Sequence, residues 1–346
     1  MPRRTPVLTR ALTRTPALIA AAVLLPLALT ACSSSDGDAA ATGDKAAAKS
    51  DGFPYTVKNC GVTTTYQAPP KRVVTMNQHV TEIMLELGLA KSLVGTAYLD
   101  DKVLPKYAKD YASVPVIAKE YPSYEQVLAA RPDFVYGGYA SAFAAGDGRG
   151  REALKKSGIE TRLNTENCAG TATPMDTLYE EVREVGRTFG VADRAEAWIE
   201  RARTDNAATA GKLKELEPVS VFVYDSGDKT AFTAGGKGIG NELIKRAGGT
   251  NVFADLDKSF GDASWENVVA RKPEAIVIYD YGSTTVEQKK KRLLTDPALK
   301  DVPAIRNQRF AVMPLSDAVL GVRVPAAVGK LAAQLHPETG EAAPTP

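Results

Sequence analysis

The sequence predicts an α/β protein built from two α/β lobes joined by a single long rigid α-helix, with a ligand cleft between the lobes. The first observation is a repeat: Ser123–Glu125 and Ser264–Glu266 each open a short helical run with a capping serine and an acidic residue two positions on. Each run closes at a proline, Pro132 or Pro273, and an apolar β-rich run follows at the same offset.

The second observation is one long helical pattern, Asp193–Leu216, between two stretches that alternate β and α patterns. Similar lobes on either side of one helix can hold a ligand between their strand ends. The arrangement therefore favours a binding protein over an enzyme with a single site.

The first residues predict export. Four arginines precede an apolar stretch, 17–29, that is too short to span a bilayer and has the flanks of a secretory signal. It closes on Leu29-Thr30-Ala31-Cys32, which resembles the lipobox of bacterial lipoproteins, where the cysteine receives a diacylglyceryl group. An ordinary signal peptide with a chance cysteine is the alternative. Two acyl chains give stable anchoring, so we expect attachment to the outer face of the cell membrane.

The charge pattern argues against nucleic-acid binding. The whole chain carries a formal charge of +2, and removal of the four leader arginines takes it to about −2. The remaining Lys and Arg residues are interleaved with Asp and Glu and form no basic stripe.

Two further cysteines, Cys60 and Cys168, would remain after lipidation of Cys32. Thiols in an oxidising compartment tend to pair, which predicts a structural disulfide in the first lobe. Two buried free thiols are the alternative.

The ends of the mature chain read as unstructured. The stretch after Cys32 is rich in Ser, Ala, Asp and Gly without apolar periodicity, so burial cannot offset the entropy of ordering it. The predicted organisation is a signal peptide at 1–31, a flexible tether at 32–52, an N-terminal α/β lobe at 53–175, a helical connector with the inter-lobe helix at 176–217, a C-terminal α/β lobe at 218–336 and a disordered tail at 337–346.

The N-terminal lobe should carry a mostly parallel sheet, because its β and α patterns alternate. Tyr55–Val57 and Val62–Tyr66 flank the turn residues Asn59-Cys60-Gly61, which predicts a hairpin. The elements that follow are the strand Val73–Thr75, a helix through Ile83 to Gly88, the strand Leu93–Gly95, the helix after Ser123 and the strand Phe134–Tyr136.

The connector contains helical patterns and no strand. Its second helix carries Ala195, Trp198 and Ile199 at helical spacing. Because a continuous helix resists bending, we expect only modest lobe movement on binding. The C-terminal lobe then repeats the alternation with the strand Val219–Tyr224, the helix Ile239–Ala247, the helix after Ser264, the strands Ala275–Tyr281 and Arg309–Met313 and a final helix from Val324.

The lipobox, the two lobes, the long helix and the Ser-x-Glu repeat together resemble the class III substrate-binding proteins of ABC importers for iron–siderophore, haem and vitamin B12 compounds. The resemblance covers the mature chain except its tails. It implies a monomer that binds a small-molecule metal chelate and delivers it to an ABC permease with its ATPase subunits.

The resemblance also implies docking residues. In that family a glutamate on the first helix of each lobe docks onto arginines of the permease, and Glu82 and Glu242 match, each six residues before a glycine. Alone, either glutamate reads as a solvated surface charge, but the matched placement favours docking. An exposed ion pair contributes only about 0.2–1 kcal/mol, so its loss should impair uptake and not ligand binding.

We expect the ligand to meet the loops beyond the carboxyl ends of the strands, which are rich in aromatic residues. Tyr and Trp offer wide apolar faces with a polar edge, suited to a large, partly polar chelate, although core or rim packing is the alternative for each ring. Arg323 could reach an anionic group, which would favour catecholate or carboxylate ligands, or serve as a helix cap or surface residue. The predicted ligand-binding residues are Trp265, Tyr139, Tyr281, Tyr98, Tyr224 and Arg323.

The sequence predicts neither a protein-bound metal nor a cofactor. Sites for bare zinc or manganese need several His and carboxylate ligands, and the chain has only His79 and His336. A haem-binding version would need an axial group such as His79, for which a helix-start role is the alternative. The expected ligand is a pre-formed ferric chelate.

An enzyme would need a nucleophile, a base and an orienting acid in one place, and no such combination is evident. The Gly-rich run Gly235–Gly238 lacks the spacing of a P-loop and reads as a turn before a helix. The sequence thus predicts a binding lipoprotein for a ferric siderophore. Cobalamin or haem binding in the same transporter class, and a surface lipoprotein without a transport role, are the alternatives.

Overall fold

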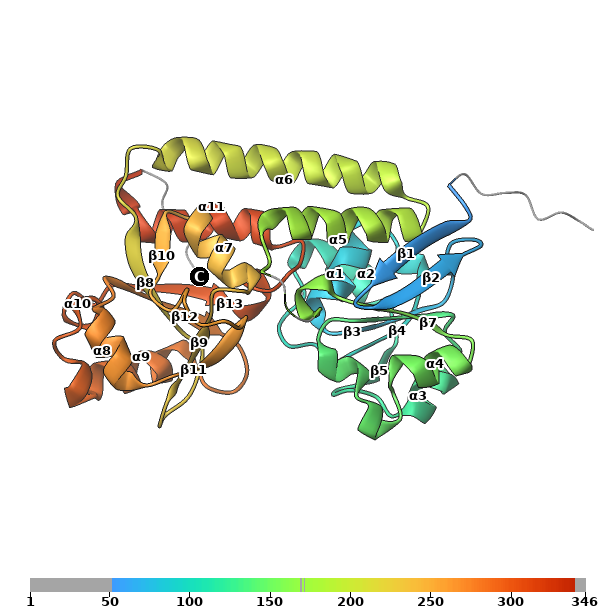
Figure 1. The fold of residues 1–346 in the computed structure, drawn as a ribbon, viewed down its shortest axis with the longest axis horizontal. Coiled ribbons are helices and arrows are strands. Elements are labelled where there is room, and N and C mark those ends of the chain that lie inside the picture. The colour runs from blue at the N-terminus through green and yellow to red at the C-terminus, as the bar shows by residue number, and fades with distance from the viewer. Residues whose placement is uncertain (1–51, 169, 171, 340–346) are drawn as a thin grey trace, which may run out of the picture. The chain divides into compact units, whose positions relative to one another are not determined.

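The computed structural model describes residues 52–168, 170 and 172–339 (Figure 1). The predicted signal peptide, Cys32 and nearly all of the predicted tether and tail lie outside the described residues. The described part belongs to one unit of dense internal contact, 48–346. No helix within it is both long and apolar enough to cross a membrane.

The first sheet is a five-stranded parallel sheet in the order β5-β4-β3-β6-β7. Its central strand β3 is buried at all four residues, as expected for a parallel strand covered on both faces. The sheet and its helices comprise β3 (Val73–Met76), α1 (Gln78–Glu86), β4 (Leu93–Ala97), α2 (Ala108–Tyr111), β5 (Val116–Ala118), α3 (Tyr124–Ala129), β6 (Phe134–Gly137), α4 (Arg151–Lys156) and β7 (Glu160–Leu163).

The predicted hairpin is confirmed and is tied to the edge of this sheet. Strands β1 (Tyr55–Asn59) and β2 (Val62–Tyr66) pair antiparallel across a turn in which Cys60 and Gly61 both have positive φ. The Asn59 side chain donates to the Leu163 carbonyl at 2.8 Å and accepts from the Leu163 amide at 2.9 Å. Cys60 is bonded to Cys168, which confirms the predicted disulfide.

The second sheet is also parallel, in the order β10-β8-β12-β13, and lies beside the antiparallel pair β9 and β11. The main strands and helices of both sheets appear where the sequence predicts them. The short strands β5 and β7 of the first sheet, β10 of the second sheet and the pair β9 and β11 were not predicted. The elements are β8 (Val219–Tyr224), β9 (Ala231–Ala234), α7 (Ile239–Arg246), β10 (Gly249–Asn251), β11 (Phe260–Ala263), α8 (Trp265–Arg271), β12 (Ala275–Asp280), α9 (Val286–Thr295), α10 (Pro303–Arg306), β13 (Phe310–Pro314) and α11 (Val324–Leu335).

The repeat found in the sequence extends to helix caps. Ser123 caps α3 by accepting a hydrogen bond from the Gln126 amide, and Ser264 caps α8 by accepting one from the Asn267 amide, both at 3.2 Å. Each helix is followed by a residue in the left-handed region, with φ of 49° in the first lobe and 48° in the second.

The acidic residue after each proline also has the same role. The Asp133 carboxylate accepts from the backbone amides of Lys71 and Arg72, just before β3, at 2.8 and 2.9 Å. The Glu274 carboxylate accepts from the amide of Ser220 in β8 at 2.9 Å. Since β6 pairs with β3 and β12 pairs with β8, each acid ties a helix–strand loop to the start of a central strand.

A shared helical layer joins the two sheets. Helix α5 (Met175–Thr188) leads into the 22-residue α6 (Ala192–Leu213), about 33 Å long, which packs against α5 and α11 (Figure 1). One hydrophobic cluster runs through this layer and takes side chains from both sheets, while the outer face of each sheet has a separate cluster. Helices α3 and α8 cover those outer faces, on the side of the sheets away from α6 (Figure 1).

We expect loss of the disulfide to destabilise the fold without rearranging it. The bond closes a sequence separation of 108 residues, so the double variant Cys60→Ser/Cys168→Ser should lose about 2–5 kcal/mol of unfolding free energy. Urea unfolding followed by tryptophan fluorescence measures this. A reductant should lower the stability of the wild type and leave the double variant unchanged, and equal stability of the two proteins without reductant would contradict the expectation.

Candidate ligand-binding cleft

Two adjoining pockets lie at the carboxyl ends of the strands, where the sequence placed the ligand site. The first, which we call the seam pocket, has a volume of about 580 Å³ and takes residues from both lobes. The second, the tyrosine pocket, has a volume of about 440 Å³ and lies within the first lobe. Asp100 lines both pockets. The seam pocket is lined by Leu99–Pro105, Asp280–Gly282, Pro314 and Arg323, and the tyrosine pocket by Tyr98, Asp100, Glu120, Tyr121, Tyr139, Ser141, Asp147 and Arg149.

Four tyrosines present their rings to these pockets, and three of them were predicted. Tyr98 packs edge-on against Tyr121 with ring centroids 4.6 Å apart. Tyr139 packs against His79 at 5.0 Å, and Tyr281 donates its hydroxyl proton to the carboxylate of Asp225. Burial raises the pKa of Tyr139 and of Tyr281 above the usual tyrosine value, so both rings are neutral at pH 7.

Asp100 is a half-buried carboxylate with few partners. Its two oxygens accept hydrogen bonds from the Asn77 side chain at 3.3 and 3.4 Å, and the carboxylate also accepts one from the backbone amide of Gln78. Burial raises the pKa of Asp100 to about 6, and the neighbouring carboxylates of Asp101 and Glu120 push it in the same direction. Asp100 is therefore ionised at pH 7 but poorly compensated.

Trp265 and Tyr224 do not lie where the sequence prediction placed them. Neither residue lines either pocket. Both belong to the outer core of the second lobe, where Trp265 is 9% exposed and Tyr224 is 3% exposed. The Trp265 indole donates to the Asp228 carbonyl at 2.8 Å, and the Tyr224 hydroxyl donates to the Gly227 carbonyl at 3.0 Å. These two residues therefore pack in the core, which was the alternative to a place in the ligand site.

Arg323 and Glu82, predicted to bind the ligand and the permease respectively, bind each other instead. Arg323 donates from Nε to one oxygen of Glu82 at 2.6 Å and from Nη2 to the other at 2.7 Å. The Glu82 side chain is 1% exposed and that of Arg323 is 5% exposed. The expected surface exposure of Glu82 is thus wrong, and Arg323 is already neutralised. Glu82 also accepts from the Leu104 amide at 2.9 Å.

A second acidic residue, which the sequence analysis did not single out, joins the lobes nearby. Glu166 follows β7 and accepts from the Ile239 amide, at the start of α7, and from the Leu320 amide, both at 2.8 Å. Asn164 donates to the Leu320 carbonyl at 2.9 Å. Burial raises the pKa of Glu166. Its only sequence signal is a polar run, Asn164–Asn167, at the end of a strand that was not predicted.

His79 is enclosed at this seam. It is 2% exposed, its Nε2 lies 3.2 Å from the Gly138 carbonyl, and it packs closely against Gly321 of the second lobe. Burial lowers its pKa to about 4, so the imidazole is neutral at pH 7. Neither ring nitrogen is presented to the cleft pockets as an axial ligand would need to be.

The two lobes also carry an equivalent pair of exposed acidic residues, which differs from the predicted pair Glu82 and Glu242. Glu125 and Glu266 of the repeat occupy the same position in the first turns of α3 and α8, and both side chains are exposed. Glu242, on α7, is 17% exposed and pairs with Arg246 at 2.6 Å.

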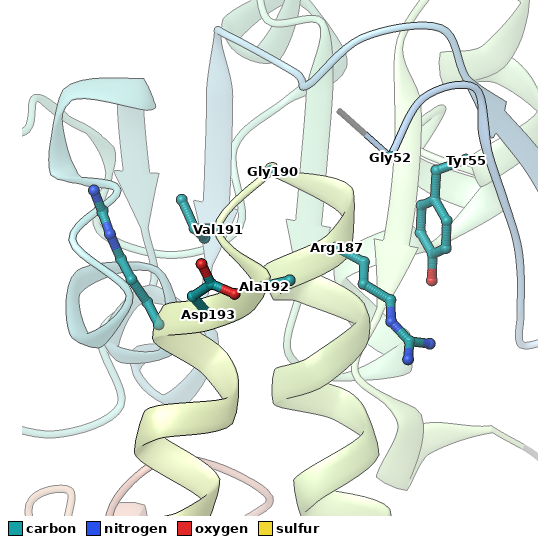
Figure 2. A pocket seen from close by; sticks show the side chains of 8 residues that line it. Gly52, Tyr55, Arg187, Gly190, Val191, Ala192 and Asp193 are labelled. Carbon is teal, nitrogen blue, oxygen red and sulfur yellow. The ribbon is translucent and has the colours of Figure 1, made fainter. Parts of the chain in front are cut away.

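A further pocket of about 610 Å³ lies away from the cleft, at the turn between α5 and α6 (Figure 2). Arg187, in the last turn of α5, reaches below Tyr55 there, whereas Val191 directly precedes α6 and Asp193 lies in the first turn of α6 (Figure 2). None of the predicted ligand-binding residues lines it. Among the described residues, no group of three or more His, Cys, Asp or Glu side chains is arranged to hold a metal ion.

Two parallel α/β sheets, one long connecting helix and a cleft at the strand ends define a two-lobed solute-binding protein of class III. The chain belongs to the periplasmic binding protein family, whose pattern matches residues 73–316. The relatives are substrate-binding proteins of ABC transporters and not enzymes, so this chain is a binding protein of the ABC transport type.

Individual comparisons agree with this family. The chain is 26% identical over 300 residues to YvrC of Bacillus subtilis, described as an uncharacterised ABC transporter substrate-binding lipoprotein, covering 85% of this chain and 90% of that one. It is 29% identical over 214 residues to a vitamin B12-binding protein of Vibrio campbellii, covering 60% and 70%.

Two solved structures are similar over most of the chain. A periplasmic binding protein from Veillonella parvula superposes with a TM-score of 0.76 and 30% identity, covering 82% of this chain and 97% of that one. A protein of an ABC-type Fe³⁺-hydroxamate transport system from Saccharomonospora viridis superposes with a TM-score of 0.69 and 25% identity, covering 84% and 100%.

We expect the Glu82–Arg323 pair to be strongly coupled, because removing one partner leaves the other charge buried and unpaired. Arg323→Met should cost about 3–5 kcal/mol of unfolding free energy. The double variant Glu82→Gln/Arg323→Met should cost clearly less than the sum of the single variants, as measured by urea unfolding. Arg246→Met, which breaks a partly exposed pair with Glu242, is the matched control and should cost less than about 1 kcal/mol. Additivity within about 0.5 kcal/mol would argue against coupling.

Proposed function

We propose that this protein is an extracytoplasmic, lipid-anchored binding protein that captures a ferric siderophore and delivers it to an ABC permease. The observation that carries the proposal is the tyrosine-lined cleft. Tyr98, Tyr121 and Tyr139 line one pocket and Tyr281 lines the next, so the adjoining volumes offer broad amphipathic rings. Such rings can hold a bulky, partly polar chelate.

The cleft suits a pre-formed chelate better than a bare ion. A protein site for a transition metal needs several converging imidazole, thiolate or carboxylate ligands, and the described residues include no such group. On this proposal the iron is cargo held by the siderophore.

Cobalamin is the second candidate, because the Vibrio campbellii relative is named a vitamin B12-binding protein and a corrin ring could also stack on tyrosines. Haem is less well supported because His79 is enclosed between Gly138 and Gly321. A surface lipoprotein that serves no transporter is a further alternative. An uptake experiment distinguishes it from the siderophore, cobalamin and haem transport functions.

Lipid anchoring rests on Cys32 and its preceding residues, together with the lipoprotein description of the YvrC relative. Two acyl chains on Cys32 would hold the protein at the membrane, and the residues up to about 52 would give it reach. The protein would act there as a monomer.

For docking onto the permease we favour Glu125 and Glu266 over Glu82. They are exposed, sit in equivalent first turns of α3 and α8, and belong to the repeat that both lobes share. Glu82 is buried in an ion pair. Two similar acidic points, one from each lobe, can meet two basic points of a permease and so set the orientation of the complex.

A panel of ligands tests the binding proposal. Ferric siderophores of the hydroxamate class should quench the intrinsic tyrosine and tryptophan fluorescence and raise the melting temperature, because a ligand that binds only the folded state stabilises it. Cobalamin and haem are the comparison ligands in the same titration. Tight binding of cobalamin alone would replace the siderophore assignment, and failure of the whole panel would refute both.

Charge reversal tests the docking proposal. The double variant Glu125→Lys/Glu266→Lys should abolish uptake by cells and leave ligand binding to the purified protein unchanged. Glu152→Lys/Glu287→Lys is the matched control, since these exposed glutamates also lie in first turns, one in each lobe. Normal uptake by the first variant, or equal loss in both, would refute the assignment of docking to Glu125 and Glu266.

A further inference from the structure

We propose that the cleft selects a ligand with a positively charged group, and that Asp100 is the carboxylate that determines this specificity. This inference rests on the proposed function and narrows it to chelates such as ferric hydroxamates that carry an ammonium group. It replaces the expectation that Arg323 would favour an anionic ligand.

The pocket walls carry more negative than positive charge. Asp100 lies where the seam pocket and the tyrosine pocket meet, with Asp101 and Asp280 on one side and Glu120 and Asp147 on the other. The basic residues in the same walls are Lys102, Arg149 and Arg323.

Two of these three cations are already neutralised by other groups. Arg323 is bound to Glu82 through two hydrogen bonds, and Glu82 itself lines neither pocket. Arg149 is 5% exposed and pairs with Asp147 at 3.0 Å. The exposed Lys102 is the remaining cation of the walls, against Asp100, Glu120 and Asp280. The cleft is therefore acidic towards a ligand.

Asp100 is the carboxylate best placed to use a ligand cation. It is already partly desolvated, and its hydrogen-bond partners in the protein, the Asn77 side-chain amide and the Gln78 backbone amide, are neutral. A cationic ligand group beside Asp100 would compensate its negative charge. Because Asp100 has already lost part of its hydration, forming this pair would cost less desolvation than forming one at a fully exposed carboxylate. An anionic group at the same place would face a like charge whose hydrogen-bond partners are all neutral.

One tyrosine ring adds to the preference for a cation. The faces of aromatic rings attract cations, the more so where water is excluded. Tyr121 and Tyr281 already have protein cations over their rings, Arg149 and Lys289 respectively, whereas Tyr98 lines the tyrosine pocket together with Asp100. Tyr98 and the carboxylate thus disfavour tri-anionic ferric catecholates and the propionates of haem.

A matched pair of chelates tests the inference. Ferrioxamine B is a ferric trihydroxamate with a free ammonium group, and its N-acetylated form has the same iron centre and no net charge. Fluorescence titration of the purified protein at pH 7.5 should show ferrioxamine B binding at least about tenfold more tightly, which corresponds to about 1.4 kcal/mol. Asp100→Asn should abolish the preference, while Glu287→Gln, an exposed carboxylate on α9 outside both pockets, should keep it.

The pH dependence gives a second readout on the unmodified protein. A cationic ligand binds the ionised form of Asp100, so protonation below about pH 6 should reduce the preference for ferrioxamine B between pH 7.5 and 5. The charged groups that face Asp100 from the adjoining walls are Asp101, Lys102, Glu120, Asp147, Arg149, Asp280 and Arg323.

The outcomes separate this inference from the proposed function. Equal binding of the two chelates, tighter binding of the acetylated form, or a preference that survives in Asp100→Asn would overturn the inference and leave siderophore binding intact. Failure of both chelates, and of the wider ligand panel, would instead refute the siderophore function. If Asp100→Asn does not fold, the pH series on the wild type decides, because a preference independent of pH would exclude Asp100 as its source.

Discussion

The buried Glu82–Arg323 pair is the interaction on which the geometry of the cleft depends. It joins the first helix of one lobe to the start of α11, which packs in the helical layer beside α6. An ion pair this deeply buried persists only when both charges are compensated, and Glu82 indeed accepts further hydrogen bonds from Gln78 and Leu104. Glu166 adds a second link between the lobes, because it accepts hydrogen bonds from the amides of Ile239 and Leu320 in the second lobe. Together these contacts hold the two lobes to each other, so the pocket walls keep a defined separation.

The duplication explains the scaffold but not the binding surface. Helix caps, the left-handed residues after α3 and α8, and the acids that tie loops to central strands recur in both lobes. The cleft walls do not recur: the first lobe supplies Tyr98, Tyr121 and Tyr139, whereas the second supplies mainly Tyr281. Backbone hydrogen bonding constrains the repeated positions, while the loops beyond the strands are free to differ and carry the chemistry of recognition.

The charge that the cleft presents to a ligand depends on which groups its two arginines already contact. Arg323 stabilises the inter-lobe seam and Arg149 pairs with Asp147 beneath Tyr121. Neither is left to attract an anion, and the partly desolvated Asp100 dominates the junction of the two pockets. The same constraint that holds the lobes together thereby determines the sign of the charge offered to a ligand.

Local pattern was enough to determine the fold class, the hairpin at Tyr55–Tyr66, the main strands of both sheets, α5 and α6, because these depend on periodicity, caps and turns that a sequence displays directly. It also predicted that Tyr98, Tyr139 and Tyr281 lie at the strand ends, where they line the pockets, since residues after parallel strands meet at one edge. The short strands β5, β7, β9, β10 and β11 contain three or four residues each and gain their stability from neighbours, so no local signal marks them. Only the tertiary structure decided that Glu82 meets Arg323 across 241 positions of sequence, and that Trp265 and Tyr224 fill a core. Burial and partnership are properties of the assembled chain, and residue type and spacing alone do not specify them.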